Sequence, residues 1–321
     1  MKRSILGGKK VLITGATGFV GSNLLRRCIK DGADVSIFIR NDSNPWRIKD
    51  ILANIKKFRV DLIDKGAVEK SVNKIKPEII FHAAVYGALS GQLDKKHIMA
   101  VNLKGAINLI DSCRKLDFEL FINSGSSSEY GLKPKPMNED DILEPFSAYG
   151  ISKAMAGLYA QKTAQDSKKP IITLRLFSPY GYFEDYNRLI PTVILSCLRG
   201  QHVELSSPCS VRDFIFIDDV VEAYLKTLEY KDKMRGGIFN IGSGIQYKIE
   251  DVVRKIIKLT GSRVSPEWES LKNPRIEPSR WQANRDKAEK ELHWAPIHTL
   301  DKGLIKTISW FKKNLHLYAI I

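Results

Sequence analysis

The chain has 321 residues, of which 43% are hydrophobic, and it carries a formal net charge of +15. This length and composition exclude wholesale disorder and suit one large α/β domain with a smaller appendage. The lysines are spread singly or in pairs without interleaved aromatics, so we expect a solvated surface that steers an anionic substrate rather than one that binds nucleic acid.

Six short apolar runs alternate with helical periodicity through the first half of the chain. The predicted strands cover residues 10–14, 35–39, 58–60, 78–82, 120–123 and 171–176. The predicted helices are clearest over residues 18–30, 98–115 and 149–165. Continuous apolar strands that alternate with helices are typical of a doubly wound parallel sheet.

The pattern changes after Phe177. The later elements that we predict are a helix over 189–199, strands at 214–217 and 238–241, a helix from about Asp218 and a last helix near 300–313. We expect residues 1–178 and about 210–242 to form the sheet domain. Residues 179–209 and 243–321 are then expected to form a smaller lobe that closes on the carboxyl ends of the strands.

The four cysteines, at positions 28, 113, 197 and 209, form no C-x-x-C pair and lie near no cluster of histidines. We therefore expect no bound metal and no disulfide framework. No apolar run approaches the roughly 18 residues of a membrane-spanning helix, and the basic start does not have the form of a signal peptide. A cytoplasmic protein with reduced thiols and no membrane partner is the resulting expectation.

The first predicted strand ends in a turn with three glycines, Gly15-Ala16-Thr17-Gly18-Phe19-Val20-Gly21, which opens the first predicted helix. Glycine permits a close approach of backbone to phosphate, and a helix N-terminus presents free N–H groups to a pyrophosphate. Because strand and helix flank the turn as a dinucleotide site requires, we expect a Rossmann domain. Its cofactor contacts would come from Gly15, Thr17, Gly18, Phe19, Val20 and Gly21.

The second strand ends at Arg40, where NAD-binding domains carry a ribose-binding carboxylate. Arginine pairs bidentately with a 2′-phosphate, so NADP is favoured over NAD. The alternatives are that Arg40 stacks on the adenine or that Asp42 reaches the ribose. We expect Asp61 and Leu62, after the third strand, near the adenine, and Ala83, after the fourth, beneath the cofactor.

Tyr149 and Lys153 share one face of a predicted helix. A lysine ammonium one turn away favours phenolate and lowers the tyrosine pKa, so that Tyr149 can exchange a proton with a sugar oxygen. Lys153 could also hold the nicotinamide ribose. The spacing alone is common in surface pairs. A serine-rich run at the end of the fifth strand, Ser124-Gly125-Ser126-Ser127-Ser128-Glu129, supplies a hydroxyl beside Tyr149 and strengthens the catalytic reading.

Taken together, these segments resemble the extended short-chain dehydrogenase/reductase family, and in particular its nucleotide-sugar epimerases, dehydratases and reductases. The matching segments in the first half are residues 14–21, 81–84, Asn102 with Gly105 and Asn108, the run up to Gly131, and Tyr149 with Lys153. Those in the second half are residues 174–177, 212–220, 239–244 and 292–296.

The resemblance implies the roles of several residues. Ser126, Tyr149 and Lys153 match the catalytic triad of the family. Arg212 and Arg275 match arginines that bind the diphosphate and nucleotide of the substrate, a nucleotide-diphosphate sugar. Ser178 stands where the family often has a sugar-contacting Asn.

The sequence also departs from the family at positions that bear on the reaction. Family dehydratases carry acidic residues directly after the catalytic hydroxyl, where this chain has Ser127 and Ser128, with Glu129 one position further on. These serines favour other reactions over a 4,6-dehydratase.

The reaction expected first is reduction of a 4-keto-6-deoxy sugar nucleotide by NADPH, with Tyr149 as proton donor, because Arg40 favours NADP. An epimerase that retains NAD is the main alternative, followed by a dehydratase or decarboxylase. A non-catalytic dinucleotide-binding sensor is the alternative outside the enzyme class. The resemblance also implies a homodimer through the helices over 98–115 and 149–165, with Ile98, Val101, Leu109, Ala154, Ala156 and Gly157 as candidate contacts.

Overall fold

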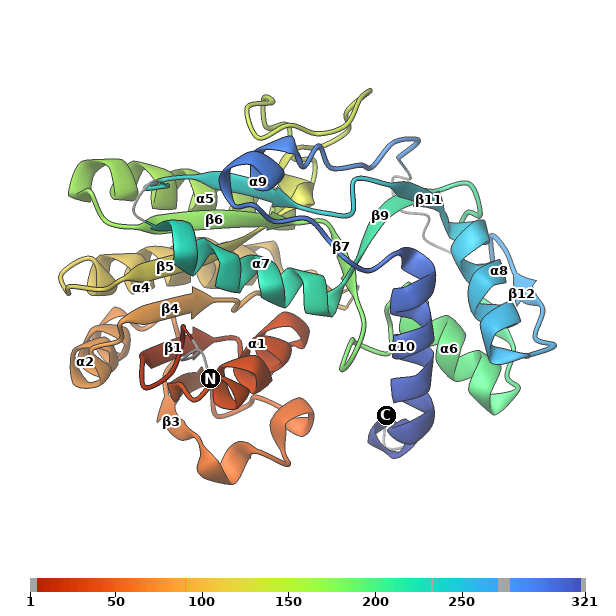
Figure 1. Cartoon of the computed structure of the whole chain (residues 1–321), viewed down its shortest axis with the longest axis horizontal. Coiled ribbons are helices and arrows are strands. Elements are labelled where there is room, and N and C mark those ends of the chain that lie inside the picture. The colour runs from red at the N-terminus through yellow and green to blue at the C-terminus, as the bar shows by residue number, and fades with distance from the viewer. Residues whose placement is uncertain (1–4, 90, 232–233, 271–277, 319–321) are drawn as a thin grey trace.

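The computed structural model describes residues 5–89, 91–231, 234–270 and 278–318 (Figure 1). Its larger part is a parallel sheet of seven strands in the order β10-β6-β5-β4-β1-β2-β3. The strands are β1 (Lys10–Thr14), β2 (Asp34–Ile39), β3 (Lys56–Arg59), β4 (Ile79–His82), β5 (Leu120–Ser126), β6 (Ile171–Leu176) and β10 (Ile238–Ile241). This is the Rossmann-like doubly wound α/β fold that the alternation of elements predicts.

Helices cover both faces of this sheet. One face carries α1 (Phe19–Lys30) and α7 (Ile217–Tyr230), and the other carries α2 (Lys65–Ile75), α4 (Gly105–Cys113) and α5 (Ala148–Ser167) (Figure 1). The short helices are α3 (Lys95–Met99) and α9 (Asp286–Glu291), with single turns η1 (Trp46–Ile48), η2 (Leu52–Asn54), η4 (Ser127–Glu129) and η6 (Leu315–Tyr318).

The smaller lobe lies beyond the carboxyl ends of the sheet strands (Figure 1). Its strands are β7 (Ser178–Tyr180), β9 (Val211–Phe216) and β11 (Gln246–Lys248) in one sheet, and β8 (Val203–Glu204) with β12 (Pro266–Glu267) in another. Its helices α6 (Leu189–Arg199), α8 (Ile249–Thr260) and α10 (Leu300–Lys313) pack on one another.

Several elements differ from their predicted bounds. The single helix expected over 98–115 consists of α3, a π-helical turn over Ala100–Lys104 (η3), and α4. Within the turn, the Asn102 side chain donates to the Tyr86 carbonyl and accepts from the Tyr86 amide, both at 2.8 Å. The strand predicted at 214–217 is β9, which begins at Val211 and ends at Phe216, because Ile217 already opens α7.

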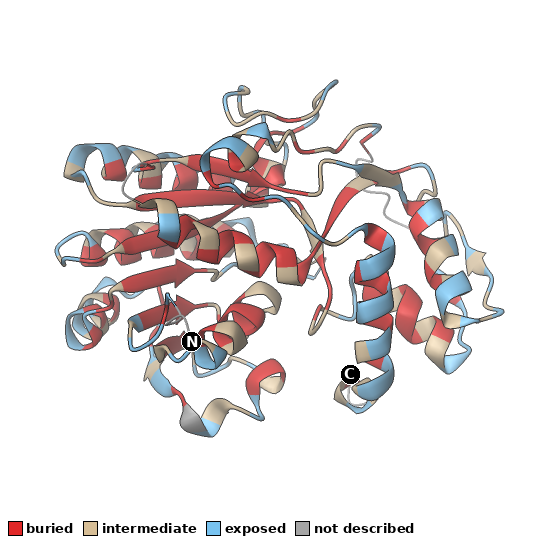
Figure 2. Ribbon diagram, viewed as in Figure 1, coloured by how far each residue is buried: buried red, intermediate tan, exposed pale blue. Residues whose placement is uncertain are grey.

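Most of the hydrophobic core falls into two clusters on opposite faces of the sheet, and a third, smaller cluster contains Tyr130, Met137, Phe177, Val211, Trp281 and Ala283. One of the two large clusters lies between the sheet and α2, α4 and α5. The other lies beneath α1 and α7 and continues without interruption into the smaller lobe, where it includes Ile256, Trp294, Leu304 and Phe311. Figure 2 shows buried positions running through both parts. The lobe therefore has no separate core, and its position relative to the sheet is fixed by packing.

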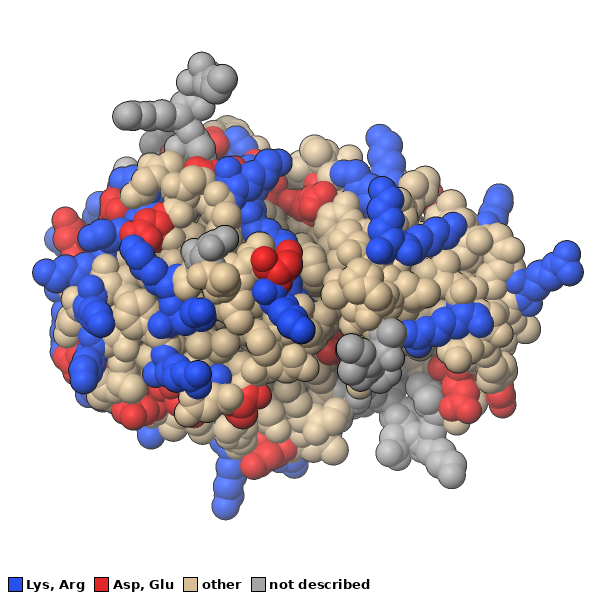
Figure 3. All heavy atoms as spheres, turned by 90° about the horizontal axis from the view of Figure 1, so that it is seen from below, with Lys and Arg blue, Asp and Glu red and all other residues tan. Residues whose placement is uncertain are grey.

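Basic side chains are scattered over the face drawn in Figure 3, with acidic and uncharged residues between them. Within the described ranges, no helix has the length and apolar character needed to span a bilayer. The same ranges contain no group of three or more His, Cys, Asp or Glu side chains arranged to hold a metal ion.

Candidate active site

The glycine-rich turn joins β1 to α1 in a conformation that requires glycine. Gly15 has a φ of +72°, and a Cβ at this position would lie 2.6 Å from the carbonyl carbon of Ala83. A Cβ on Gly21 would lie 2.1 Å from the Gly15 oxygen. The Gly18 amide donates to that same oxygen at 2.9 Å. The turn is therefore packed against the end of β4, and Ala83 lies beside it.

The N-terminus of α1 fits a pyrophosphate. Its N-cap, Gly18, offers no side-chain hydrogen bond, and its first turn contains no acidic residue. Thr17, Gly18, Phe19 and Val20 are only half-buried, so the turn's outer side is accessible. A helix end of this kind presents unpaired N–H groups and a positive dipole to an anion. The residues present thus suit the phosphates of a dinucleotide.

Arg40 and Asp61 follow the adjacent strands β2 and β3. The Arg40 guanidinium forms an ion pair with Asp42 at 3.2 Å, and 39% of its side chain is exposed. Asp61 is exposed and accepts from the Ile63 amide at 3.0 Å. The Leu62 side chain is buried and contacts Gly105 at the start of α4. Arg40 and Asp61 therefore offer polar atoms at one edge of the sheet, whereas Leu62 packs in the core.

Ser126, Tyr149 and Lys153 come together from β5 and α5. Ser126 is the last residue of β5 and is buried, and its hydroxyl lies close enough to the Tyr149 phenol to lower the pKa of that phenol. Tyr149 lies in the first turn of α5, and Lys153, one turn further along, is buried on the same helix. The Ser147 side chain caps this helix by accepting from the Gly150 amide at 3.0 Å. The capped helix start fixes the tyrosine against the end of β5.

Burial controls the protonation of the pair in a way that sequence reasoning did not predict. Desolvation raises the pKa of Tyr149, although the Ser126 hydrogen bond and the nearby Arg188 charge lower it. Desolvation also lowers the pKa of Lys153 to about 8, opposed by the charge of Glu129. The expected lowering of the tyrosine pKa by Lys153 is absent, because burial disfavours the charged form of both groups. The donor hydroxyl and the charge of Arg188 act on the phenol instead.

Glu129 is the centre of a buried network behind Ser126. Its side chain is fully buried, and its Oε1 accepts from the Ser126 amide at 2.7 Å. Its Oε2 accepts from Arg175 Nε at 2.8 Å, and Arg175 also donates to the Tyr130 hydroxyl. Both carboxylate oxygens thus accept hydrogen bonds from groups inside the protein. Glu129 therefore positions Ser126 and is not a free acid beside the substrate.

The serines after Ser126 do not replace that acid. The Ser127 hydroxyl is buried and accepts from Trp281 Nε1 at 3.0 Å. The Ser128 amide donates to the Ser126 hydroxyl at 3.1 Å. The described part of this segment therefore places one hydroxyl, that of Ser126, against Tyr149.

The predicted substrate residues lie on the lobe side. Ser178 begins β7, which pairs with β9, the strand that carries Arg212. The Arg212 guanidinium lies 5.9 Å from the centre of the Trp281 ring. Arg275 is outside the described residues. Ser178 and Arg212 thus belong to one small sheet at the junction between the two parts.

Arg188 is a site residue that sequence reasoning missed. It is the N-cap residue of α6, its side chain is exposed, and its charge reaches both Tyr149 and Glu184. An arginine that directly precedes an apolar helix after Ser178 was the available signal. Its position adds a cation to the expected substrate side of the site.

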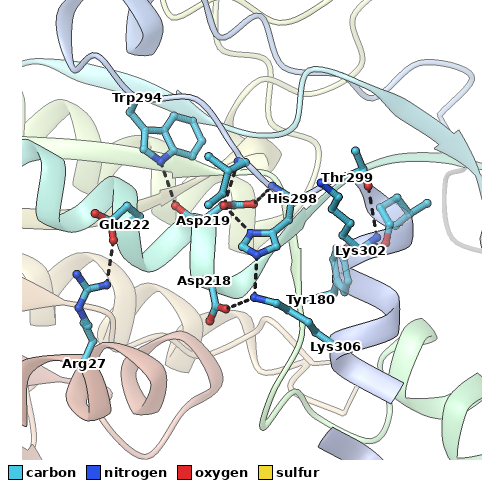
Figure 4. A network of polar contacts seen from close by, with 12 residues as sticks. Arg27, Tyr180, Asp218, Asp219, Glu222, Trp294, His298, Thr299, Lys302 and Lys306 are labelled. Atoms are coloured by element: carbon cyan, nitrogen blue, oxygen red, sulfur yellow. Dashed lines mark hydrogen bonds and ion pairs between the residues drawn. The ribbon is translucent and has the colours of Figure 1, made fainter. Parts of the chain in front are cut away.

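A separate cleft of about 710 Å³ lies between α1, α7 and α10, and it is not lined by Ser126, Tyr149 or Lys153. Figure 4 shows its polar network, in which His298 lies between Asp219 and Lys306. The Asp219 carboxylate accepts from the amides of Ile297 and His298, both at 3.2 Å, and from His298 Nδ1 at 2.9 Å. These bonds hold the segment before α10 against the start of α7, so the cleft is a junction between the two parts.

Comparison with known proteins agrees with this geometry. The model of the NAD dependent epimerase/dehydratase family matches residues 11–242. An uncharacterized UDP-glucose epimerase of Bacillus subtilis (strain 168) is 28% identical, over 94% of this chain and 97% of its own. The human dTDP-D-glucose 4,6-dehydratase is 27% identical, over 96% of this chain and 91% of its own length. The crystal structure of a Thermotoga maritima UDP-glucose 4-epimerase with UDP-glucose is 27% identical and superposes with a TM-score of 0.85, covering 95% of this chain and 99% of its own.

Proposed function

Because the chain belongs to the NAD-dependent epimerase/dehydratase family, an enzyme family that acts on nucleotide sugars, we propose that it epimerises one carbon of a nucleotide-diphosphate sugar by oxidation and re-reduction. The observation that carries the proposal is the Ser126–Tyr149–Lys153 cluster, where a phenol beside a buried serine lies one helical turn from a buried lysine. Its position beyond β5, near the glycine turn, is where a doubly wound sheet places its chemistry.

Tyr149, Ser126 and Lys153 have different roles in the proposed reaction. Tyr149 takes the proton of the sugar hydroxyl and later returns it, while Ser126 donates a hydrogen bond to the same oxygen. Lys153, with a pKa lowered to about 8, is mostly protonated at neutral pH and is available to hold the nicotinamide ribose. The Ser126 hydroxyl and the charge of Arg188 favour the phenolate when Tyr149 gives up its proton. When bound, the nicotinamide would supply the hydride acceptor and donor. Gly15, Thr17, Gly18, Phe19, Val20, Gly21 and Ala83 would hold the dinucleotide.

The substrate's anionic part requires cations on the lobe side. Arg212, Arg275 and Arg188 are the candidates, with Ser178 as a contact to the sugar. Arginine binds phosphate oxygens through parallel charge-assisted hydrogen bonds. The net charge of +15 also favours encounter with a doubly charged diphosphate.

The buried position of Glu129 favours epimerisation over dehydration. A dehydratase needs an acid at the sugar to remove water, and both oxygens of Glu129 are bonded to Ser126 and Arg175 inside the protein. Ser127 and Ser128 cannot supply that acid.

A second candidate is the reduction of a 4-keto sugar nucleotide by NADPH. Arg40 favours it, because its partly exposed guanidinium at the end of β2 suits a 2′-phosphate, and NADPH is the usual consumed reductant. Alternatively, Arg40 keeps its ion pair with Asp42 and does not bind a 2′-phosphate. NAD would then be the cofactor that the protein retains.

We also propose a homodimer through α4 and α5, with different contacts from those first expected. The expected residues Ile98, Val101, Leu109, Ala154 and Ala156 are buried within the chain itself, and Gly157 lies against Glu129 and Thr173. The outward face of α5 instead carries Ile151, Met155 and Leu158, which are 39%, 42% and 53% exposed. An apolar stripe at this spacing suits a second copy of the helix.

One experiment separates the two reactions. The purified protein is denatured to release and identify any bound dinucleotide, and it is then incubated with UDP-, dTDP-, GDP- and CDP-hexoses and with a 4-keto sugar nucleotide. An epimerase inverts a sugar carbon, seen by NMR, with no net change in reduced-nicotinamide absorbance. A reductase consumes one reduced dinucleotide per 4-keto sugar. The Tyr149→Phe variant is the control for both. Turnover of none of these substrates, with no dinucleotide bound, refutes the proposed function.

A further inference from the structure

Arg47 connects the glycine turn to the loop that precedes α6. It lies in the single turn η1 after β2 and is only 8% exposed. Its NH1 donates to the carbonyl of Thr17 at 3.3 Å, and its Nε donates to the carbonyl of Phe183 at 2.6 Å. Its NH2 pairs with Asp185 at 3.4 Å. One rigid guanidinium group therefore bridges the expected phosphate-binding turn and residues 183–185.

The far end of this bridge is a strained segment. Phe183 has a φ of +63°, a left-handed conformation that is costly for a residue with a side chain and persists only where the surroundings enforce it. The Phe183 ring is held by Trp310, with centroids 4.6 Å apart, and by the Arg26 guanidinium, 4.4 Å from its centre. Because Arg47 holds the carbonyl of the same residue, it helps to fix the strained backbone.

The strained segment leads directly to Arg188, whose charge acts on the Tyr149 phenol. Within it, the buried Glu184 accepts from the Gly181 amide, and the Asn187 amide donates to Asp185 at 3.1 Å. The Arg188 amide donates to the Asp185 carbonyl at 2.9 Å. A change in the backbone at 183–185 therefore moves Arg188, whose charge lowers the pKa of Tyr149.

We propose that Arg47 is a positioning residue that couples the two binding sites, so that a dinucleotide at the glycine turn and a nucleotide-diphosphate sugar at the 181–188 loop tighten each other's binding. The inference rests on the proposed function. A ligand that clamps the turn fixes the Thr17 carbonyl, which fixes Arg47 and with it the Phe183 backbone. The second ligand then meets a loop whose backbone the first ligand has already restrained through Arg47, and such coupling is reciprocal by thermodynamic necessity.

The test measures binding and needs no turnover. Affinity for NADH and NADPH is titrated by nicotinamide fluorescence, with and without saturating UDP or dTDP. In the unmodified protein the nucleoside diphosphate should tighten dinucleotide binding by a factor within the usual range of about 5- to 150-fold. In Arg47→Met this factor should fall to about 2-fold or less, because the bridge between Thr17 and Phe183 is gone.

Three further variants distinguish coupling from general stability. Trp310→Leu removes the ring that packs against Phe183 at 4.6 Å and leaves the bonds of Arg47 to Thr17 and Phe183 in place, so it should lower Tm and keep the coupling factor. Arg47→Lys retains the positive charge but loses the planar guanidinium group with its several N–H donors, so it should keep part of the coupling factor. Asp185→Asn removes the ionic partner of Arg47 in the loop but leaves the 2.6 Å bond from Arg47 Nε to the Phe183 carbonyl, so it should lower the factor only in part.

Two outcomes would overturn the inference while leaving the proposed function in place. One is that the unmodified protein binds dinucleotide and nucleoside diphosphate without mutual effect. The other is that Arg47→Met, or Arg47→Lys if Arg47→Met does not fold, retains the full coupling factor. If the unmodified protein binds neither ligand, the proposed function itself fails.

Discussion

Replacement of Glu129 by glutamine tests whether this carboxylate is a buried anchor or a catalytic acid. Glu129 is fully buried and its ion-pair partner Arg175 is 3% exposed. Both carboxylate oxygens face donors, the Ser126 amide at 2.7 Å and Arg175 Nε at 2.8 Å. In Glu129→Gln one oxygen becomes an NH₂ group that faces a donor, and the arginine charge loses its counter-charge.

The expected loss of stability is large. Removing one partner of a buried ion pair costs about 3–5 kcal/mol, because the other charge stays buried and uncompensated. At about 2.1 cal/mol/K per residue, the unfolding entropy of the 321-residue chain is about 0.7 kcal/mol/K. The expected fall in Tm is therefore about 4–8 °C. Glu129→Leu combined with Arg175→Met should recover part of this loss, since no charge is then left buried.

The assay is thermal unfolding by near-ultraviolet circular dichroism, with the single and double variants measured in parallel. Turnover should fall as well, because the Ser126 amide loses its acceptor and the serine loses its fixed position. If Glu129→Gln unfolded within 1 °C of the unmodified protein yet lost all activity, Glu129 would be a chemical participant and the anchoring role would be wrong.

Three other changes give separate tests. Lys153→Met should raise stability by about 3 kcal/mol at pH 7, from a shift of the lysine pKa from 10.5 to about 8. The lysine pKa is lower in the folded protein than in the unfolded chain, so the unfolded chain binds more protons between pH 8 and 10.5. The unmodified protein therefore becomes more stable across this pH range, and the stability gain of Lys153→Met should shrink. Thermal melts at a series of pH values measure this gain, and a constant gain would refute the prediction. Gly21→Ala should abolish dinucleotide binding in fluorescence titrations, since its Cβ would lie 2.1 Å from the Gly15 oxygen. Gly66→Ala, with its nearest atom at 3.5 Å, is the matched control, and equal binding by both variants would contradict the clash. Leu158→Glu should convert a dimer to a monomer in light scattering, and an unchanged mass would exclude the α5 face.

Most of the sheet was predictable from the sequence because strands buried on both faces are continuous apolar runs. The strands β1, β2, β4 and β6 follow this rule closely. The strands β8 and β12 have two residues each, too few to show any periodicity. The π-helical turn escaped prediction because it depends on Asn102 bonding a loop residue, Tyr86, that helical spacing does not report.

The candidate site also combines features that the local sequence pattern predicts with features that depend on contacts between distant residues. The glycine turn and the Tyr149–Lys153 pair are local patterns, so sequence spacing located them. The burial of Glu129 depends on Arg175, which lies 46 positions further along the chain. The bridge made by Arg47 joins Thr17 to Phe183, which lies 136 positions after the arginine. Contacts of this kind exist only once the fold has formed, so neither role could be predicted.

The path of the chain between its two parts limits how this protein can diversify. After β6 the chain enters the smaller lobe at β7, returns through α7 to β10, leaves again for β11 and α8, and comes back to α9 before ending on α10 (Figure 1). Neither part is one uninterrupted stretch of sequence, and one apolar cluster runs through both. Recombination at a single crossover therefore cannot transplant the lobe onto another sheet. New substrate preferences must arise in place, through substitutions and loop-length changes that leave the shared core intact.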